Sequence, residues 1–255
     1  MKFDELQMKK GKGKIVMLTA YDYQMAKILD EAGIDLILVG DSLGMVIQGY
    51  TDTKSVTVED MLYHTRAVAR GVKNTPIIGD MPINSDKSVE DALRNAKQFL
   101  EAGAHGVKIE GNKPKVVKTL LNAGIPVMGH VGLLPQTAES YRVKGKQPTE
   151  AQKIQDDAVK LDKLGVFSMV LECMPESLAK RITEAVNALT IGIGAGRHCD
   201  GQVLVINDML GFDESFAPKY LKRYVNINKM IKGAVARFKK EVSRGIYPDE
   251  EHTYH

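Results

Sequence analysis

Four short apolar runs in this chain each end on an acidic residue. The acids are Asp41, Asp80, Glu110 and Glu172, and each follows a stretch rich in Ile, Val or Leu. Apolar runs of this length, separated by segments with helical patterning, are typical of buried parallel strands. Ligands of α/β folds bind at the carboxyl ends of such strands, so we expect the four carboxylates to converge on one site. Because clustered acids repel one another and lose hydration, their convergence indicates a cation, a shared proton or a reaction.

A second pattern shows how these runs are connected. Four times a helical segment ends at a glycine and an apolar run follows directly, which predicts left-handed glycines that end helices at Gly33, Gly103, Gly124 and Gly165. Helix starts are indicated by capping-box patterns and by prolines suited to the first helical turn. These lie at Thr57 to Asp60, Ser88 to Asp91, Thr149 to Gln152, Pro114 and Pro175.

The number of strands sets the predicted fold class. We expect strands near residues 14–19, 34–40, 76–80, 104–110, 125–129, 167–172, 189–193 and 203–206. Eight strands alternating with helices in 255 residues favour a closed (β/α)8 TIM barrel over an open, doubly wound sheet. The chain has no linker or break in composition, so we predict a single domain over residues 1–255, with two further helices after residue 215.

Composition excludes several classes of partner. The net charge of +3 and the aromatic content of 6% argue against a nucleic-acid surface. No apolar run reaches transmembrane length, and residues 1–14 lack the apolar stretch of a signal peptide. Cys173 and Cys199 form no CxxC pattern, which argues against a disulfide framework or structural zinc. We therefore predict a soluble, cytoplasmic protein with reduced thiols.

The two strand-end aspartates suggest a metal. Asp41 and Asp80 suit Mg²⁺, which takes one or two carboxylates together with waters and substrate oxygens. Either aspartate alone could instead cap a following turn, but the pair together with Glu110 favours the metal. Lys108 lies two residues before Glu110 and faces the same way. It could pair with Glu110 or with a substrate carboxylate, and a Schiff-base role is disfavoured because neighbouring acids keep a lysine protonated.

Other residues at predicted strand ends have open roles. The apolar setting of Glu172 suits general-base work, although it could be a structural acid that binds a neighbouring basic group. His130 could be structural or catalytic. The glycine-rich stretch 192–197 could bind phosphate or merely turn tightly beside a ligand. Long connections over residues 44–56 and 131–148 follow two of the strands, as lids or binding loops do.

These motifs together resemble the ketopantoate hydroxymethyltransferase (3-methyl-2-oxobutanoate hydroxymethyltransferase) family. The resemblance extends in order from about Lys14 to the C-terminal helix. It is carried by residues 18–23, 39–45, 56–61, 79–82, 107–111, 129–133, 171–175 and 192–196.

The resemblance implies a (β/α)8 barrel and a Mg²⁺-dependent reaction of pantothenate biosynthesis. In that reaction a hydroxymethyl group passes from methylene-tetrahydrofolate, the co-substrate, to 3-methyl-2-oxobutanoate (ketoisovalerate), which gives ketopantoate. By position, Asp41, Asp80 and Glu110 would hold the metal, and Glu172 would be the base. The keto acid would contact Asp41, Ser42, Asp80 and Lys108. The resemblance also implies a homo-oligomer, a decamer in relatives of bacterial type.

The chain departs from the family pattern at a few positions, none of them a predicted catalytic residue. They are Gly79, residues 83–87, Leu134, Thr137, and Glu139 and Ser140 before Tyr141. Two alternatives compete with this function. One is another metal-enolate lyase or aldolase on the same barrel, from which folate dependence would distinguish it. The other is a non-catalytic ligand-binding barrel, which the intact set of acids and Lys108 argues against.

Overall fold

The computed structural model describes residues 2–255, which form two compact units. The first unit ends at Val205, and the second is Ile206–His255. The prediction of a single domain over the whole chain stays a prediction. No helix within residues 2–255 combines the length and the apolar composition needed to cross a bilayer.

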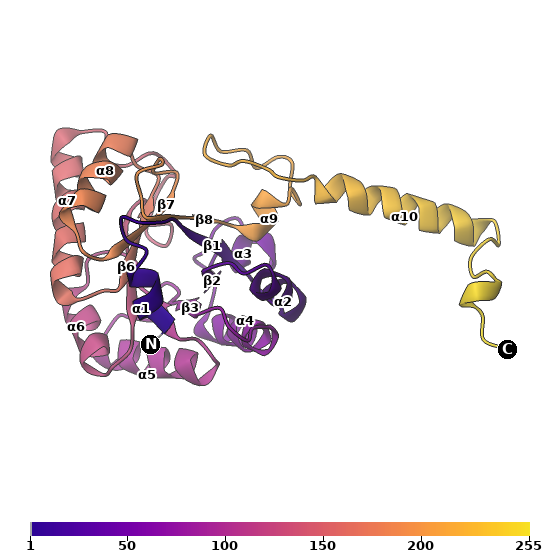
Figure 1. Ribbon diagram of the computed structural model, residues 1–255, viewed down its shortest axis with the longest axis horizontal. Coiled ribbons are helices and arrows are strands. Elements are labelled where there is room, and N and C mark those ends of the chain that lie inside the picture. The colour runs from indigo at the N-terminus through magenta and orange to yellow at the C-terminus, as the bar shows by residue number, and fades with distance from the viewer. Residues whose placement is uncertain (1) are drawn as a thin grey trace. The chain divides into compact units, whose positions relative to one another are not determined.

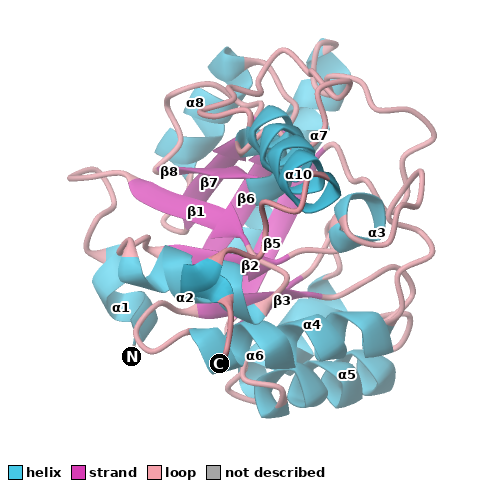
Figure 2. Ribbon diagram, turned by 90° about the vertical axis from the view of Figure 1, so that its right-hand side faces the viewer, coloured by secondary structure: helices cyan, strands magenta, loops and turns pink. Residues whose placement is uncertain are grey.

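The first unit is built on a closed barrel of eight parallel strands that pair in sequence order, with β8 beside β1. Figure 2 shows the strands enclosed by helices. The predicted (β/α)8 barrel is therefore confirmed, and all eight strands lie within a few residues of their predicted positions. They are β1 (Ile15–Thr19), β2 (Leu36–Val39), β3 (Ile77–Asp80), β4 (Gly106–Lys108), β5 (Val127–Gly132), β6 (Ser168–Glu172), β7 (Leu189–Ile193) and β8 (Gly201–Leu204).

Helices connect these strands and form the outer layer of the barrel (Figure 1). Each long helix turns a few apolar side chains toward the strands; in α5, for example, Phe99 is fully buried. The connecting helices are α2 (Tyr23–Glu31), α3 (Leu43–Val46), α4 (Val58–Gly71), α5 (Val89–Glu101), α6 (Pro114–Asn122), α7 (Pro148–Leu164) and α8 (Glu176–Ala185).

A short N-terminal helix, α1 (Lys2–Gln7), covers the end of the barrel where the strands begin. Phe3 and Leu6 belong to the same core cluster as the barrel strands, and the Phe3 ring lies 4.3 Å from that of Phe167. The following turn is held by ion pairs from Lys9 to Asp35 and from Lys10 to Asp200. With this end covered by packed side chains, the opposite end remains for a functional site.

The second unit contains α9 (Ile206–Met209), α10 (Ile227–Ser243) and a three-residue 3-10 turn, η1 (Glu250–His252). Asn226 caps α10 by accepting a hydrogen bond from the backbone N–H of Lys229. The prediction of two helices after residue 215 is wrong, because only α10 is an α-helix there. Gly245, with φ of 64°, and Pro248 interrupt the backbone after α10.

Most of the predicted helix boundaries are confirmed. All four glycines that were predicted to end helices have positive φ, and Thr57 forms a complete capping box with Asp60. Ser88 caps α5, and Pro114 begins α6. Two details are wrong, and in the first of them Pro148 starts the helix two residues earlier than a cap at Thr149 would. Thr149 lies inside α7, which begins at Pro148, and Pro175 is the residue before α8.

One side chain near the end of α2 fixes the loop that leads into β3. The Asp30 carboxylate accepts hydrogen bonds from the backbone N–H groups of Lys73, Asn74 and Thr75 at 2.8–3.0 Å. Partial burial alone would raise the pKa of Asp30, but these hydrogen bonds outweigh it and lower the pKa to about 2. Asp162 on α7 holds the loop before β7 in the same way, through the N–H groups of Asn187 and Ala188.

We expect Asp30→Ala to lower the stability of the barrel by roughly 1–3 kcal/mol at pH 7, because three backbone donors lose their acceptor. Since the folded-state pKa is depressed, the contribution of Asp30 is present above its ordinary value of 3.8 and is lost as the pH falls through about 2. Urea unfolding at a series of pH values measures this, with Glu31→Ala on the same helix as the control. A deficit that persists unchanged at pH 2 would contradict the carboxylate as its source.

Candidate active site

The carboxyl ends of four strands bring the four predicted acids to one end of the barrel. Asp80 and Glu172 end β3 and β6, and Asp41 and Glu110 follow β2 and β4 by two residues. Asp41, Asp80 and Glu110 are at most 5% exposed, and the Glu172 side chain is 16% exposed. The four predicted acids therefore lie at one mouth of the barrel, at the carboxyl ends of β2, β3, β4 and β6.

The centre of the site is an ion pair between Lys108 and Asp80. The Lys108 Nζ lies 2.7 Å from both carboxylate oxygens of Asp80, and both side chains are almost fully buried. Lys108 and Asp80 are register partners on the adjacent strands β4 and β3. Burial alone would lower the pKa of Lys108, but Asp80, Glu110 and Asp41 outweigh it and raise that pKa above 10.5. Lys108 is therefore a buried cation among the acids.

Asp41 lies beside this pair and caps no helix. Its backbone N–H contacts Asp80 Oδ2 at 3.3 Å, and its Oδ2 accepts a hydrogen bond of 2.9 Å from Gln136 Nε2. Burial and the charge of Asp80 raise the pKa of Asp41 well above its ordinary range. Burial also raises the pKa of Asp80, although Lys108 opposes it. Both shifts arise first from burial, which disfavours the charged form of a carboxylate.

His130 on β5 links the other two acids. Its Nδ1 lies 3.4 Å from Glu110 Oε1, and its Nε2 lies 3.2 Å from Glu172 Oε2. Burial and Lys108 would lower the pKa of His130, but the two glutamates outweigh them and raise it to about 9. Burial alone would raise the pKa of Glu110, but His130 outweighs it and lowers that pKa. His130 thus lies between Glu110 and Glu172, with one ring nitrogen near each carboxylate.

The turn after β6 fixes the position of Glu172. Cys173 has φ of 45°, an uncommon conformation for a residue other than glycine, and its N–H donates to the Ile193 carbonyl at 2.9 Å. Gly132, with φ of 102°, ends β5 beside it, and a Cβ there would lie 2.3 Å from the Glu172 carbonyl oxygen. Only glycine allows β5 to approach Glu172 this closely.

Ser42 is the remaining predicted contact of the keto acid. Its Oγ lies 2.8 Å from the hydroxyl of Tyr21, which is buried and itself lies just after β1. The Tyr21 carbonyl in turn contacts His64 Nδ1 on α4 at 2.6 Å. The Ser42 hydroxyl is therefore held in place at the rim of the acid cluster.

The donor set fits a hard divalent cation. Asp41 and Asp80 are adjacent, buried carboxylates, and Glu110 Oε1 accepts no hydrogen bond of regular geometry. Within residues 2–255, no three His, Cys, Asp or Glu side chains are grouped closely enough to hold a metal by themselves. Mg²⁺ needs only one or two protein carboxylates when substrate oxygens and water complete its shell. Asp41 and Asp80 could therefore hold such an ion, with Glu110 near its shell.

Both long loops meet above the acids. Lys54 Nζ from residues 44–56 donates to the carbonyl of Ala138 at 3.2 Å, and Lys144 N–H donates to the carbonyl of Cys173 at 2.8 Å. Gln136 lies earlier in the loop after β5 and also anchors it. Its side chain donates to the Met81 carbonyl at 3.0 Å, and its backbone N–H donates to Glu110 at 3.2 Å. The loop after β5 is thus anchored to the segments that come directly after β2, β3, β4 and β6.

Gln136 and Tyr21 were not among the residues predicted to form the site. Both are polar side chains that follow barrel strands, and Gln136 lies in the long loop over residues 131–148. Position after a strand and, for Tyr21, membership of the motif at residues 18–23 were the signals available, because the hydrogen-bond partners of both residues come from elements distant in the sequence.

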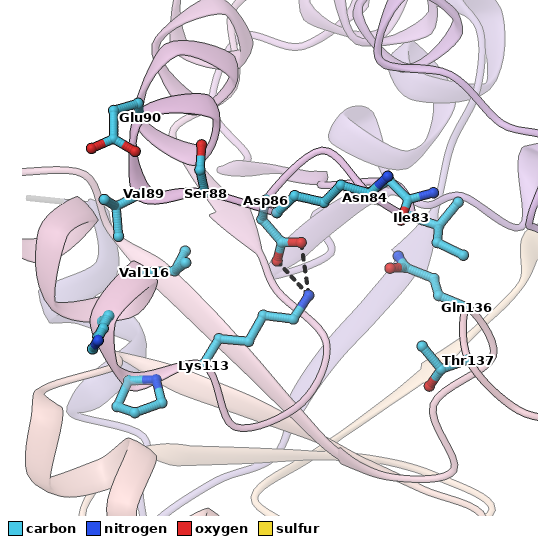
Figure 3. Close-up of a pocket in the computed structure, with 13 residues that line it drawn as sticks. Ile83, Asn84, Asp86, Ser88, Val89, Glu90, Lys113, Val116, Gln136 and Thr137 are labelled. Atoms are coloured by element: carbon cyan, nitrogen blue, oxygen red, sulfur yellow. Dashed lines mark hydrogen bonds and ion pairs between the residues drawn. The ribbon is translucent and has the colours of Figure 1, made fainter.

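A cavity of about 790 Å³ adjoins the site outside the barrel mouth. It lies among the β3–α5 loop, the start of α6 and the loop after β5, and Gln136 lines it (Figure 3). Across the cavity, Lys113 Nζ contacts both oxygens of Asp86 at 2.6 and 2.7 Å. Gln136 therefore contributes to both the cavity wall and the acid cluster.

Comparison with known proteins decides the family. Residues 1–250 match the model of the ketopantoate hydroxymethyltransferase family. The chain belongs to this family. It is 52% identical over 254 residues to the 3-methyl-2-oxobutanoate hydroxymethyltransferase of Syntrophus aciditrophicus (strain SB), with 97% of this chain and 93% of that protein covered. The enzyme of the same name from Clostridium botulinum (strain Langeland / NCTC 10281 / Type F) is 51% identical, with 99% and 94% covered. The predicted family and enzyme class are confirmed.

Solved structures confirm the barrel among more distant proteins. Phosphonopyruvate hydrolase in complex with oxalate and Mg²⁺ superposes with a TM-score of 0.66 at 14% identity, covering 100% of this chain and 92% of that one. The 2,3-dimethylmalate lyase, a PEP mutase/isocitrate lyase superfamily member, gives a TM-score of 0.62 at 12% identity, with 99% and 92% covered. At these identities the likeness shows that this chain has the same fold as these two proteins.

We expect Lys108→Met to destabilise the enzyme by roughly 3–5 kcal/mol, because it leaves Asp80 buried without its counter-ion. Lys113→Met is the matched control: it breaks a two-oxygen contact of similar length, but Lys113 is 38% exposed, so about 1 kcal/mol or less is expected. Urea unfolding of both variants measures the difference. Equal losses would show that burial is not what makes the Lys108 pair important.

Proposed function

We propose that this chain catalyses the Mg²⁺-dependent transfer of a hydroxymethyl group from methylene-tetrahydrofolate to 3-methyl-2-oxobutanoate, which gives ketopantoate. The observation that carries the proposal is the single buried cluster that unites Asp41, Asp80 and Lys108 with Glu172 across His130. The relatives named for this reaction, at about half of all positions identical, support the same conclusion.

The metal site of the proposal consists of Asp41 and Asp80, with Glu110 in its shell. When bound, Mg²⁺ supplies positive charge that polarises the keto oxygen and stabilises negative charge as it develops. Gln136 orients the Asp41 carboxylate toward this position by donating to its Oδ2.

Lys108 and Ser42 position the keto acid. Two of the three Lys108 donors face Asp80, which leaves one for the substrate carboxylate. The Ser42 hydroxyl, held by Tyr21, offers a further donor at the same rim. Asp41 and Asp80 complete the proposed keto acid site through the metal they share with it.

Glu172 acts as the base that removes the proton from C3. Its Oε2 faces His130 Nε2, so one carboxylate oxygen is oriented and the other remains for the substrate. Overall, the C3–H bond is replaced by a C3–CH2OH bond. The methylene carbon comes from the folate carrier, and the hydroxyl oxygen comes from water.

Further parts of the proposal rest on family resemblance. They are a role in pantothenate biosynthesis, a cytoplasmic location and assembly as a homo-oligomer, a decamer in relatives of bacterial type.

A direct assay tests the function. We expect ketopantoate from 3-methyl-2-oxobutanoate and methylene-tetrahydrofolate in the presence of Mg²⁺, and none after chelation or in the folded Asp80→Ala variant. Mass spectrometry follows the product, and calorimetry measures Mg²⁺ and keto acid binding. Folate-independent turnover of another keto acid would favour a metal-enolate lyase instead, and unchanged Mg²⁺ binding by Asp80→Ala would remove it from the metal site.

We expect Glu172→Gln to keep keto acid binding and to lose proton abstraction on the order of 10²–10⁴-fold, because the amide has the same shape but is not a base. Exchange of the C3 proton of 3-methyl-2-oxobutanoate in deuterated water, followed by NMR, isolates this step from folate. A variant that exchanges at the wild-type rate would assign the base to another group.

A further inference from the structure

Residues 138–147 stretch across the mouth of the barrel between two anchors. At one end, the carbonyl of Ala138 accepts a hydrogen bond from Lys54 of the loop after β2. At the other end, Lys144 N–H donates to the carbonyl of Cys173, the residue after Glu172. Tyr141 lies midway, three residues from each anchor. The segment therefore runs from the side of the mouth that holds Asp41 to the side that holds Glu172.

Tyr141 presents its ring to solvent at the edge of the acid cluster. The residue is 55% exposed. Partial burial and the nearby charges of Asp52, Asp41, Glu172 and Glu110 raise the pKa of its hydroxyl. A large aromatic face, held at a rim and left open on one side, is suited to a flat ring system.

The next residues of the same segment are basic. Arg142 and Lys146 line a recess of about 450 Å³, together with Gln147, Thr149 and Glu150. Across residues 2–255, neither Arg142 nor Lys146 forms an ion pair. In this segment the aromatic Tyr141 is thus followed by Arg142 and Lys146, two cations that form no ion pair among the described residues.

We propose that residues 138–147 bind the one-carbon carrier, with its pterin ring against Tyr141 and its anionic tail against Arg142 and Lys146. This inference rests on the proposed function, which requires such a carrier. The carrier must bring its methylene group to C3 of a keto acid held among Asp41, Asp80 and Lys108, so its ring must lie at the mouth. Carboxylates of the tail suit a guanidinium and an ammonium group.

The larger cavity of about 790 Å³ is the competing location. Its central cation, Lys113, is already paired with Asp86 (Figure 3). Gln136, at 4% exposure and hydrogen-bonded to Asp41 and Met81, lies between this cavity and the acids. A carrier bound there would have to displace Gln136 to reach the keto acid, whereas Tyr141 is open to the mouth.

The ring contact is tested by Tyr141→Leu and Tyr141→Phe. We expect Tyr141→Leu to raise the KM for methylene-tetrahydrofolate about tenfold, because it removes one aromatic stacking contact with the pterin ring. Phe should keep the wild-type KM, because it retains the ring. In both variants the KM for the keto acid and the folate-free exchange of its C3 proton should remain within about twofold of wild type. Tyr63→Leu, on the outer face of α4 and 66% exposed, is the control.

The tail contact is tested with carriers of different length. We expect Arg142→Gln combined with Lys146→Gln to raise the KM for methylene-tetrahydrofolate several-fold. The same variant should leave unchanged the KM for a methylene-tetrahydropterin that lacks the glutamate tail. Lys153→Gln, an exposed lysine further along α7, is the control and should change neither value.

Each remaining outcome contradicts the inference in a distinguishable way. An unchanged carrier KM in Tyr141→Leu overturns it while the proposed function stands, provided the wild type makes ketopantoate. A raised carrier KM in Lys113→Gln, with none in Tyr141→Leu, moves the carrier to the larger cavity. Loss of C3 exchange in Tyr141→Leu would show that the residue supports the acid cluster rather than the carrier. Absence of ketopantoate from the wild type, with C3 exchange intact, overturns the proposed function and this inference together.

Discussion

The contact between Lys108 and Asp80 is the interaction on which the rest of the site depends. Asp41 and Glu110 lie buried beside it, and without a fixed cation the mutual repulsion and lost hydration of the three carboxylates would favour their neutral forms. Lys108 supplies that cation from a strand, where its position is set by barrel register rather than by a flexible loop. The barrel therefore holds the charges at the mouth by the same hydrogen bonds that hold its strands together.

Gln136 connects this buried cluster to the loop after β5. Its amide donates to Asp41 and to the Met81 carbonyl, and its backbone N–H donates to Glu110. The loop after β5 cannot move far without breaking contacts to residues that follow three other strands. The same loop then continues to Tyr141 and to the anchor beside Glu172. Gln136 consequently links the position of the loop at the rim to the positions of the buried acids Asp41 and Glu110.

Sequence patterns could predict the barrel and its acids because both depend on local signals. Glycines with positive φ end the helices, apolar runs fill the barrel, and acids follow them where the strands end. The partner of Lys108 could not be predicted. Spacing along one strand suggested Glu110, whereas the register between strands pairs Lys108 with Asp80 and leaves Glu110 facing His130. Register between strands is a tertiary property, and the contacts of Gln136 and Tyr21 were inaccessible for the same reason.

The balance of charge explains why these particular groups are found together. Asp41, Asp80, Glu110 and Glu172 carry four negative charges when ionised. Lys108 and an imidazolium at His130, whose pKa is about 9, carry two positive charges at neutral pH. Two negative charges remain, and Asp41 and Asp80 are neighbouring buried carboxylates within that cluster. A divalent cation at Asp41 and Asp80, as in the proposed function, would compensate this excess in full. Glu172 lies beside His130 at the edge of the cluster, more exposed than the other three acids, where the proposed base must meet the substrate.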